Sequence, residues 1–119
     1  MDRERFISEL ETTDNNINNE QLFNVLKRSI DCNLKDGNPR GHRNLIIVME
    51  ELAELAQAVS KELRGKCDHY NLLEELADVQ LCIYYVQEIC NISDDDLSKA
   101  MNVKINRLDE VLSKRGEYQ

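Results

Sequence analysis

The chain is 119 residues long, the size of one ordinary domain. Its 23 acidic residues outnumber its 15 basic residues, and the formal net charge of −8 excludes the basic footprint for nucleic acid and disfavours an anionic membrane surface. Four Gly and one Pro are too few for a turn-rich β protein, and the longest apolar run, Leu45 to Met49, is far shorter than a membrane span. No export signal is recognisable, so we expect a cytoplasmic, all-α protein with no nucleic-acid or membrane partner.

Residues 1–18 are polar and are predicted to form a flexible leader with a short helix over Arg3–Leu10. A first firm helix is expected from about Asn19, as the N-cap, because apolar residues then recur at helical spacing. It ends before the helix-breaking cluster at 36–41. With three more helices, residues 19–119 are predicted to form one domain, a four-helix bundle.

The second predicted helix runs from about Asn44 to Leu63 and stops at Gly65, a natural C′ residue. The third runs from Asn71, whose side chain can cap while Glu74 reaches back, to about Cys90. Ser93 is predicted to cap the fourth helix, and the three aspartates that follow it suit the positive end of the helix dipole.

The four cysteines stand at positions 32, 67, 82 and 90. They form no CxxC pair, and neither His is spaced with them as a zinc ligand. We predict reduced thiols, with Cys82 and Cys90 buried in the apolar stretch in which they lie.

The second helix is unusual because it is apolar nearly all round. Eleven of the fifteen residues from Leu45 to Val59 are apolar, and the acids among the rest are Glu50, Glu51 and Glu54. A helix with this pattern is normally buried. The three carboxylates are therefore expected at or near an interior.

The third helix repeats the pattern, with Glu74, Glu75 and Asp78 at the start of a mostly apolar stretch. Glu75 and Asp78 are three residues apart, as are Glu51 and Glu54, so each pair shares a helix face. Two like charges about 5 Å apart repel by about 3 kcal/mol at an effective dielectric constant of 20. Four carboxylates around one point must therefore be protonated, hydrated or bound to a cation.

Hard oxygen ligands without an adjacent His favour Mg²⁺, or Mn²⁺ as a substitute, over zinc. A di-iron carboxylate bundle requires Glu-x-x-His pairs, and neither His42 nor His69 lies three residues after a Glu. A di-iron site is therefore disfavoured.

The segments 49–55 (MEELAEL) and 73–79 (LEELADV) together resemble the all-α nucleoside triphosphate pyrophosphohydrolases of the MazG-like group. The hallmark of that group is EExxE followed by ExxD, and here twenty residues separate Glu54 from Glu75. The similarity covers roughly Asn44 to Gly116 and is nearest to the small stand-alone members of phages and bacteria.

The resemblance implies a four-helix MazG-like bundle that hydrolyses nucleoside triphosphates to monophosphate and pyrophosphate with Mg²⁺. Glu50 and Glu51 would be catalytic, with Glu50 a further ligand or the group that orients or deprotonates the attacking water. Metal ligands would be Glu51, Glu54, Glu75 and Asp78, and the triphosphate would be bound by Lys61, Arg64, Lys104 and Arg107.

Two features depart from the family pattern. Lys104 and Arg107 stand closer together than the corresponding residues, and Cys82 occupies the position of an aromatic residue that stacks on the base in some relatives. The sequence therefore does not indicate which base and sugar of the nucleotide substrate are preferred.

The apolar residues that surround the second and third helices exceed what one bundle can bury, which predicts a homodimer or homotetramer. The resemblance points the same way and allows basic residues of a neighbouring chain to complete each site. A second interpretation is a non-catalytic helical interaction module whose acidic cluster binds a cation. A phosphohydrolase of the HD type is a distant third, because the chain has no His-Asp dipeptide.

Overall fold

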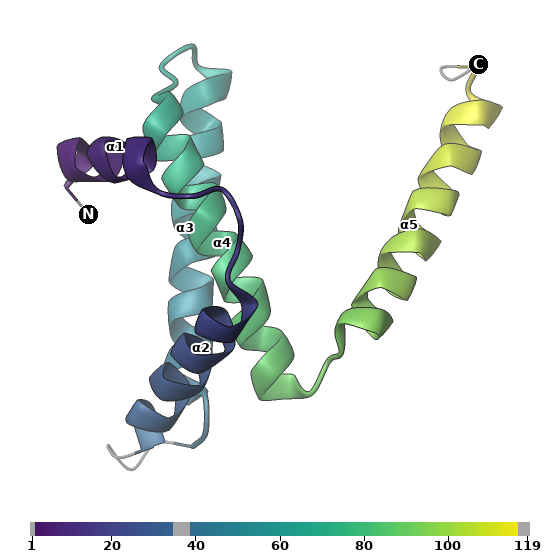
Figure 1. The fold of residues 1–119 in the computed structure, drawn as a ribbon. Coiled ribbons are helices and arrows are strands. Elements are labelled where there is room, and N and C mark those ends of the chain that lie inside the picture. The colour runs from purple at the N-terminus through teal and green to yellow at the C-terminus, as the bar shows by residue number, and fades with distance from the viewer. Residues whose placement is uncertain (1, 35–38, 117–119) are drawn as a thin grey trace. The chain divides into compact units, whose positions relative to one another are not determined.

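The computed structural model describes residues 2–34 and 39–116 of the chain (Figure 1). Within these ranges the chain forms five α-helices and no strand, so the prediction of an all-α fold is confirmed. The helices are α1 (Arg3–Thr12), α2 (Asn19–Leu34), α3 (His42–Leu63), α4 (His69–Cys90) and α5 (Asp94–Lys114).

The chain divides into two compact units near the end of α4. The first unit extends to Ile89 and contains α1, α2, α3 and nearly all of α4, while α5 lies in the second. Both acidic motifs therefore belong to the first unit, and Lys104 and Arg107 belong to the second.

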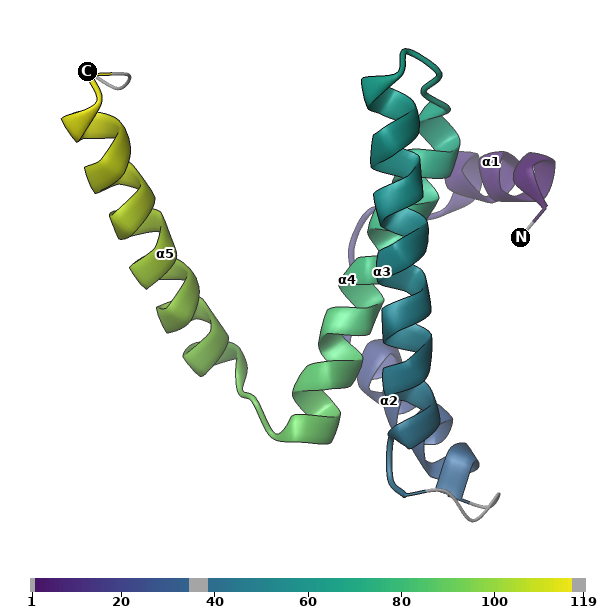
Figure 2. The same ribbon diagram turned by 180° about the vertical axis from the view of Figure 1, so that it is seen from behind.

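Helices α3 and α4 lie side by side and run in opposite directions, as Figures 1 and 2 show from the two sides. The turn between them opens at Gly65, which has a φ of +70°. Its N–H donates to the carbonyl of Glu62 at 3.1 Å, and the N–H of Lys66 donates to the carbonyl of Lys61 at 2.9 Å. These are the two bonds of a Schellman motif, so the predicted helix stop is confirmed.

Two of the predicted N-caps are wrong by one and three residues. The side chain of Asn18, not Asn19, caps α2 by accepting from the N–H of Gln21 at 3.0 Å. Helix α4 begins at His69, and Asp68 caps it by accepting from the N–H of Asn71 at 3.2 Å. Asn and Asp are about equally good caps, so the path of the chain into each helix decides which residue is used.

Helix α3 begins at His42, two residues before the predicted start at Asn44, and follows Gly41 with a φ of +76°. A Cβ atom on Gly41 would lie 2.6 Å from Cγ1 of Ile89, so the start of α3 touches the end of α4 closely. The predicted cap of α5 is confirmed, since Oγ of Ser93 accepts from the N–H of Asp96 at 3.1 Å.

Helix α2 packs on α3 near the end of the hairpin that is opposite the turn. Leu26 and Ile30 are buried there, and Nδ2 of Asn44 donates to Oγ of Ser29 at 3.1 Å. Of the helix-breaking cluster predicted to follow this helix, residues 36–38 lie outside the described residues.

Few apolar side chains of the described residues are buried, namely Leu26, Ile30, Ala58 and Cys82. Many larger ones on α3 and α4 are exposed, among them Ile47, Met49, Leu52, Val59, Leu73, Leu76, Leu81 and Ile83. The interior that this unit forms by itself is therefore small. Even so, no helix of the described residues has the length and apolar character to cross a membrane.

All four cysteines have free thiols, as predicted. Cys82 is buried, but Cys90 is exposed at the last position of α4, so the prediction for Cys90 is wrong. Cys90 lies at the end of the helix, because the next residue, Asn91, leaves it with a φ of +56°.

Candidate metal centre

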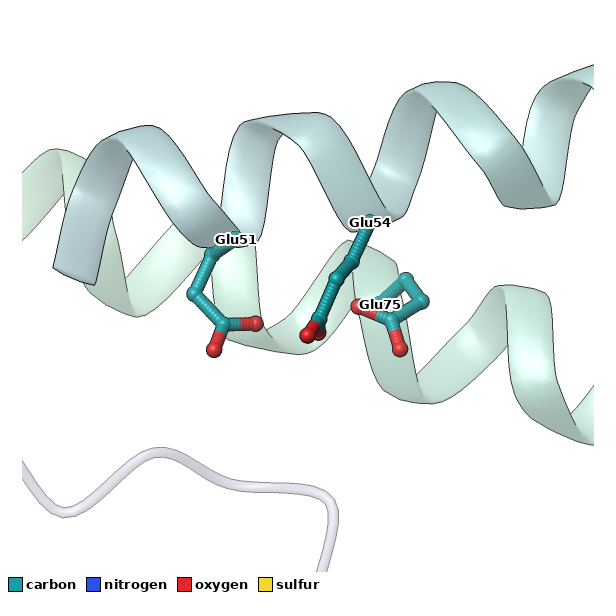
Figure 3. Close-up of side chains that lie close together, drawn as sticks. All are labelled: Glu51, Glu54 and Glu75. Carbon is teal, nitrogen blue, oxygen red and sulfur yellow. The ribbon is translucent and has the colours of Figure 1, made fainter.

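Three carboxylates from two helices meet on one side of the α3–α4 hairpin. Glu51 and Glu54 project from α3 and Glu75 projects from α4 (Figure 3). One oxygen of each lies within 4.8 Å of the other two. We call these three residues the acidic cluster.

This spacing suits one hard cation. Oxygens on opposite sides of a Mg²⁺ ion lie about 4 Å apart, because each Mg–O distance is about 2.1 Å. Three oxygens within 4.8 Å of one another therefore reach a common ion with small side-chain movements. Within the described residues the cluster contains oxygen donors alone, which is the donor set that Mg²⁺ and Mn²⁺ prefer.

Two oxygens of the cluster are shielded from solvent and unsatisfied. Oε2 of Glu51 and Oε2 of Glu75 have almost no accessible surface and no hydrogen-bond partner among the described residues. A buried polar atom without a partner costs free energy, and a buried charge costs more. A bound cation or a proton would remove this cost.

The pKa of Glu51 reflects this environment. Burial of the carboxyl raises it to about 7, helped by the negative charges of Asp78, Glu54 and Glu75. The pKa of Glu75 is also raised, first by burial and then by the charges of Glu54 and Asp78. Without a cation, the cluster therefore keeps a proton up to about neutral pH.

Asp78, the fourth predicted ligand, lies next to Glu51. Burial raises the pKa of Asp78, and a hydrogen bond with the Glu51 carboxyl opposes that increase. Its oxygens are not among those gathered within 4.8 Å. The structure thus brings three predicted ligands together and places Asp78 beside them.

The structure does not bring Glu50 into the acidic cluster. It is exposed, and it precedes Glu51 on α3, where consecutive side chains point about 100° apart. Its predicted part in binding metal or handling the attacking water stays a prediction.

The predicted phosphate-binding residues are exposed in both units. Lys61 lies seven residues after Glu54, which is nearly two helical turns and roughly the same face of α3. Nε of Arg64 donates to the carbonyl of Ser60 at 3.3 Å, within its own helix. Lys104 and Arg107 stand one turn apart on α5.

Sequence reasoning missed an ion pair between Arg3 and Asp68, which joins α1 to the start of α4. The sequence does indicate the cap at Asp68, because an Asp just before a helical stretch is a common N-cap. No sequence signal pairs it with Arg3, which is 65 residues away.

Comparison with known proteins yields no match, whether to a family model, a curated protein or a solved structure. The MazG-like resemblance therefore depends on the two acidic motifs and stays a prediction. What the chain can do must be argued from its own residues.

Proposed function

We propose that this protein is a cytoplasmic, Mg²⁺-dependent nucleotide pyrophosphohydrolase of the MazG-like type, which cleaves (deoxy)nucleoside triphosphates to monophosphate and pyrophosphate. The observation that carries the proposal is the convergence of Glu51, Glu54 and Glu75 within 4.8 Å, with two of their oxygens buried and unsatisfied. The order EExxE then ExxD on two adjacent helices supports the same reaction.

In this reaction Glu51, Glu54, Glu75 and Asp78 would hold Mg²⁺, which when bound neutralises phosphoryl charge and lowers the pKa of water. Glu50 would orient the attacking water or accept its proton. Water attacks the α-phosphorus, the bond from that atom to the bridging oxygen breaks, and pyrophosphate leaves with the electron pair.

The substrate is strongly anionic and the protein carries a net charge of −8, so local positive charge is needed. We assign this role to Lys61, Arg64, Lys104 and Arg107, together with the metal. The chain has no GxxxxGK[ST] sequence, so a glycine-rich phosphate loop of that kind is not available for the purpose.

The proposal is tested by incubating the purified protein with canonical and modified nucleoside triphosphates and Mg²⁺ or Mn²⁺. Monophosphate and pyrophosphate, with no free phosphate, is the expected product pattern. Release of free phosphate would point to another hydrolase. No turnover across the panel, in a protein that still binds Mn²⁺, would favour the non-catalytic cation-binding module instead.

We further propose that the protein is a homo-oligomer, at least a dimer. The exposed apolar residues of α3 and α4 support this, since extensive apolar surface on a small protein usually marks a partner surface. A self-complementary interface formed by parts of these helices would bury it. A neighbouring chain could then supply basic residues such as Lys104 and Arg107 to the acidic cluster.

Light scattering at micromolar concentration measures the oligomeric state directly. We expect a species of at least twice the 13.8 kDa chain mass. A fully active, monodisperse monomer would contradict the proposal. A charged substitution at exposed Leu81 should shift the population toward monomer, whereas the same change at exposed Ser98 should not.

A further inference from the structure

Arg3 links helix α1 to the hairpin. Arg3 forms an ion pair through Nη1 with Oδ2 of Asp68. The guanidinium carbon of Arg3 also lies 5.8 Å from the centre of the Tyr70 ring, within cation–π range. Helix α1 is thereby joined to the first turn of α4, the helix that carries Glu75.

The side chain of Asp68 is also held by a hydrogen bond at the start of α4. Its Oδ1 accepts from the N–H of Asn71 as the cap of α4, which leaves Oδ2 for the guanidinium. The Tyr70 ring packs edge to face against His69, with ring centres 5.6 Å apart and planes at 77°. Groups that are already held lose less conformational entropy when they form a contact.

Residues 13–18 connect α1 to α2, and both ends of this linker are held. Oγ1 of Thr13 donates to the carbonyl of Glu9 at 2.6 Å where α1 ends. Asn18 caps α2, which is packed against α3. Six residues span at most about 20 Å when fully extended, so the linker has little slack while α1 stays attached.

The linker runs along the side of the hairpin toward which the acidic cluster points. Figure 3 shows the carboxylates of the cluster directed from the two helices toward this segment, and Figure 1 shows the segment crossing the hairpin between α1 and α2. Glu54 is the exposed member of the acidic cluster, and we call the side of the hairpin toward which it points the open side.

We infer that residues 3–18 form an N-terminal strap that closes over the open side of the acidic cluster and that Arg3 holds it shut. The inference rests on the proposed function, because the strap would control the entry of ligands to that metal centre. Asp14 is the one charged residue of the linker, so the linker offers no cation for a triphosphate. We therefore assign the linker to opening and closing over the cluster rather than to binding phosphate.

The attachment is weak enough to open. The side chains of Arg3 and Asp68 are 57% and 33% exposed. An exposed ion pair and one cation–π contact together shift such an equilibrium by roughly five- to thirtyfold. The strap is then closed most of the time and opens often enough to admit a nucleotide.

Hydrogen exchange of the full-length protein tests the attachment. Arg3→Gln and Tyr70→Leu should each speed exchange of the amides at 13–18 by about fivefold, and Arg3→Lys should recover part of the protection. Arg5→Gln is the matched control, because Arg5 pairs with Glu9 inside α1 at 2.7 Å. Equal exchange in the wild type and Arg3→Gln would overturn the inference.

Release of Mn²⁺ into excess chelator tests whether the strap covers the cluster. We expect Arg3→Gln to release Mn²⁺ about fivefold faster than the wild type, and Arg5→Gln to match the wild type. Faster exchange of the linker with unchanged Mn²⁺ release would overturn the covering role. A wild-type protein that binds no Mn²⁺ would refute the metal centre, while the exchange data would still decide whether Arg3 holds the strap.

Discussion

Replacing Glu51 or Glu75 by Gln is expected to abolish turnover while the fold is kept. Each residue supplies an oxygen to the acidic cluster, and Oε2 of each has no hydrogen-bond partner among the described residues. A neutral amide binds Mg²⁺ more weakly than a carboxylate. Losing about 4 kcal/mol of transition-state stabilisation would slow the reaction by roughly three orders of magnitude.

The same substitutions should stabilise the protein when no metal is present. The pKa values of Glu51 and Glu75 are both raised, so ionising them in the folded protein is unfavourable. Removing one of these charges near neutral pH relieves repulsion and burial of charge. We expect the metal-free melting temperature to rise by roughly 4 °C, for about 1 kcal/mol of added stability.

Glu62→Gln is the matched control, because Glu62 is an exposed residue of the same helix and lies outside the acidic cluster. It removes the same charge and should leave turnover and Mn²⁺ binding close to those of the wild type. Near-normal activity in both Glu51→Gln and Glu75→Gln would refute the assignment of the cluster as the metal centre. Circular dichroism establishes that each variant is folded.

Affinity for Mn²⁺ is expected to fall steeply as the pH drops below 7. A cation requires ionised carboxylates, and burial raises the pKa of Glu51 to about 7. Below that pH each Mn²⁺ ion must displace a proton from Glu51. The apparent affinity for Mn²⁺ therefore weakens tenfold for each pH unit. Because Glu51 is already half protonated at pH 7, the dissociation constant should increase by roughly 50-fold between pH 7 and pH 5.

Calorimetric titration with Mn²⁺ at pH 5, 6, 7 and 8 measures this dependence. Ordinary glutamates have a pKa near 4.3 and would leave the affinity almost flat across the range, which is the contradicting result. In Glu51→Gln this dependence should be reduced, since the carboxyl whose pKa is raised to about 7 is gone, and Glu75 and Asp78 are the neighbouring carboxyls whose pKa values stay raised.

The stability of the metal-free protein should fall as the pH rises, whereas the affinity for Mn²⁺ rises. Because the pKa of Glu51 is higher in the folded protein than its usual value, the folded state binds the proton more tightly than the unfolded state. This stabilisation is fully present below pH 4.5 and is lost as the pH rises to about 7. Saturating Mn²⁺ should restore stability at pH 8, where the carboxylates are ionised.

The all-helical architecture followed from the sequence, and so did the faces on which the acids lie. Helical periodicity is a local property, so the spacing of Glu51 and Glu54 sufficed to place both side chains on one side of α3. The stop at Gly65 and the cap at Ser93 were equally local, because each depends on a few neighbouring residues.

The helix starts show where local reasoning ends. Asp68 and Asn71 are both competent caps, and the turn of the hairpin selects Asp68. That choice places an acidic side chain where Arg3 meets it, across 65 residues of sequence. No pattern within either segment specifies the other partner.

Only the tertiary structure decided which acids share a site. Glu75 meets Glu51 and Glu54 because the turn and the packing of α3 against α4 fix the longitudinal register of the two helices. Glu50 lies beside Glu51 in the sequence and yet outside the cluster, since one residue of an α-helix turns the side chain by about 100°. Residue identity and spacing thus determined which carboxylates were available, and the alignment of the two helices determined which of them converge, because the distance between groups on different helices depends on packing that no single segment encodes.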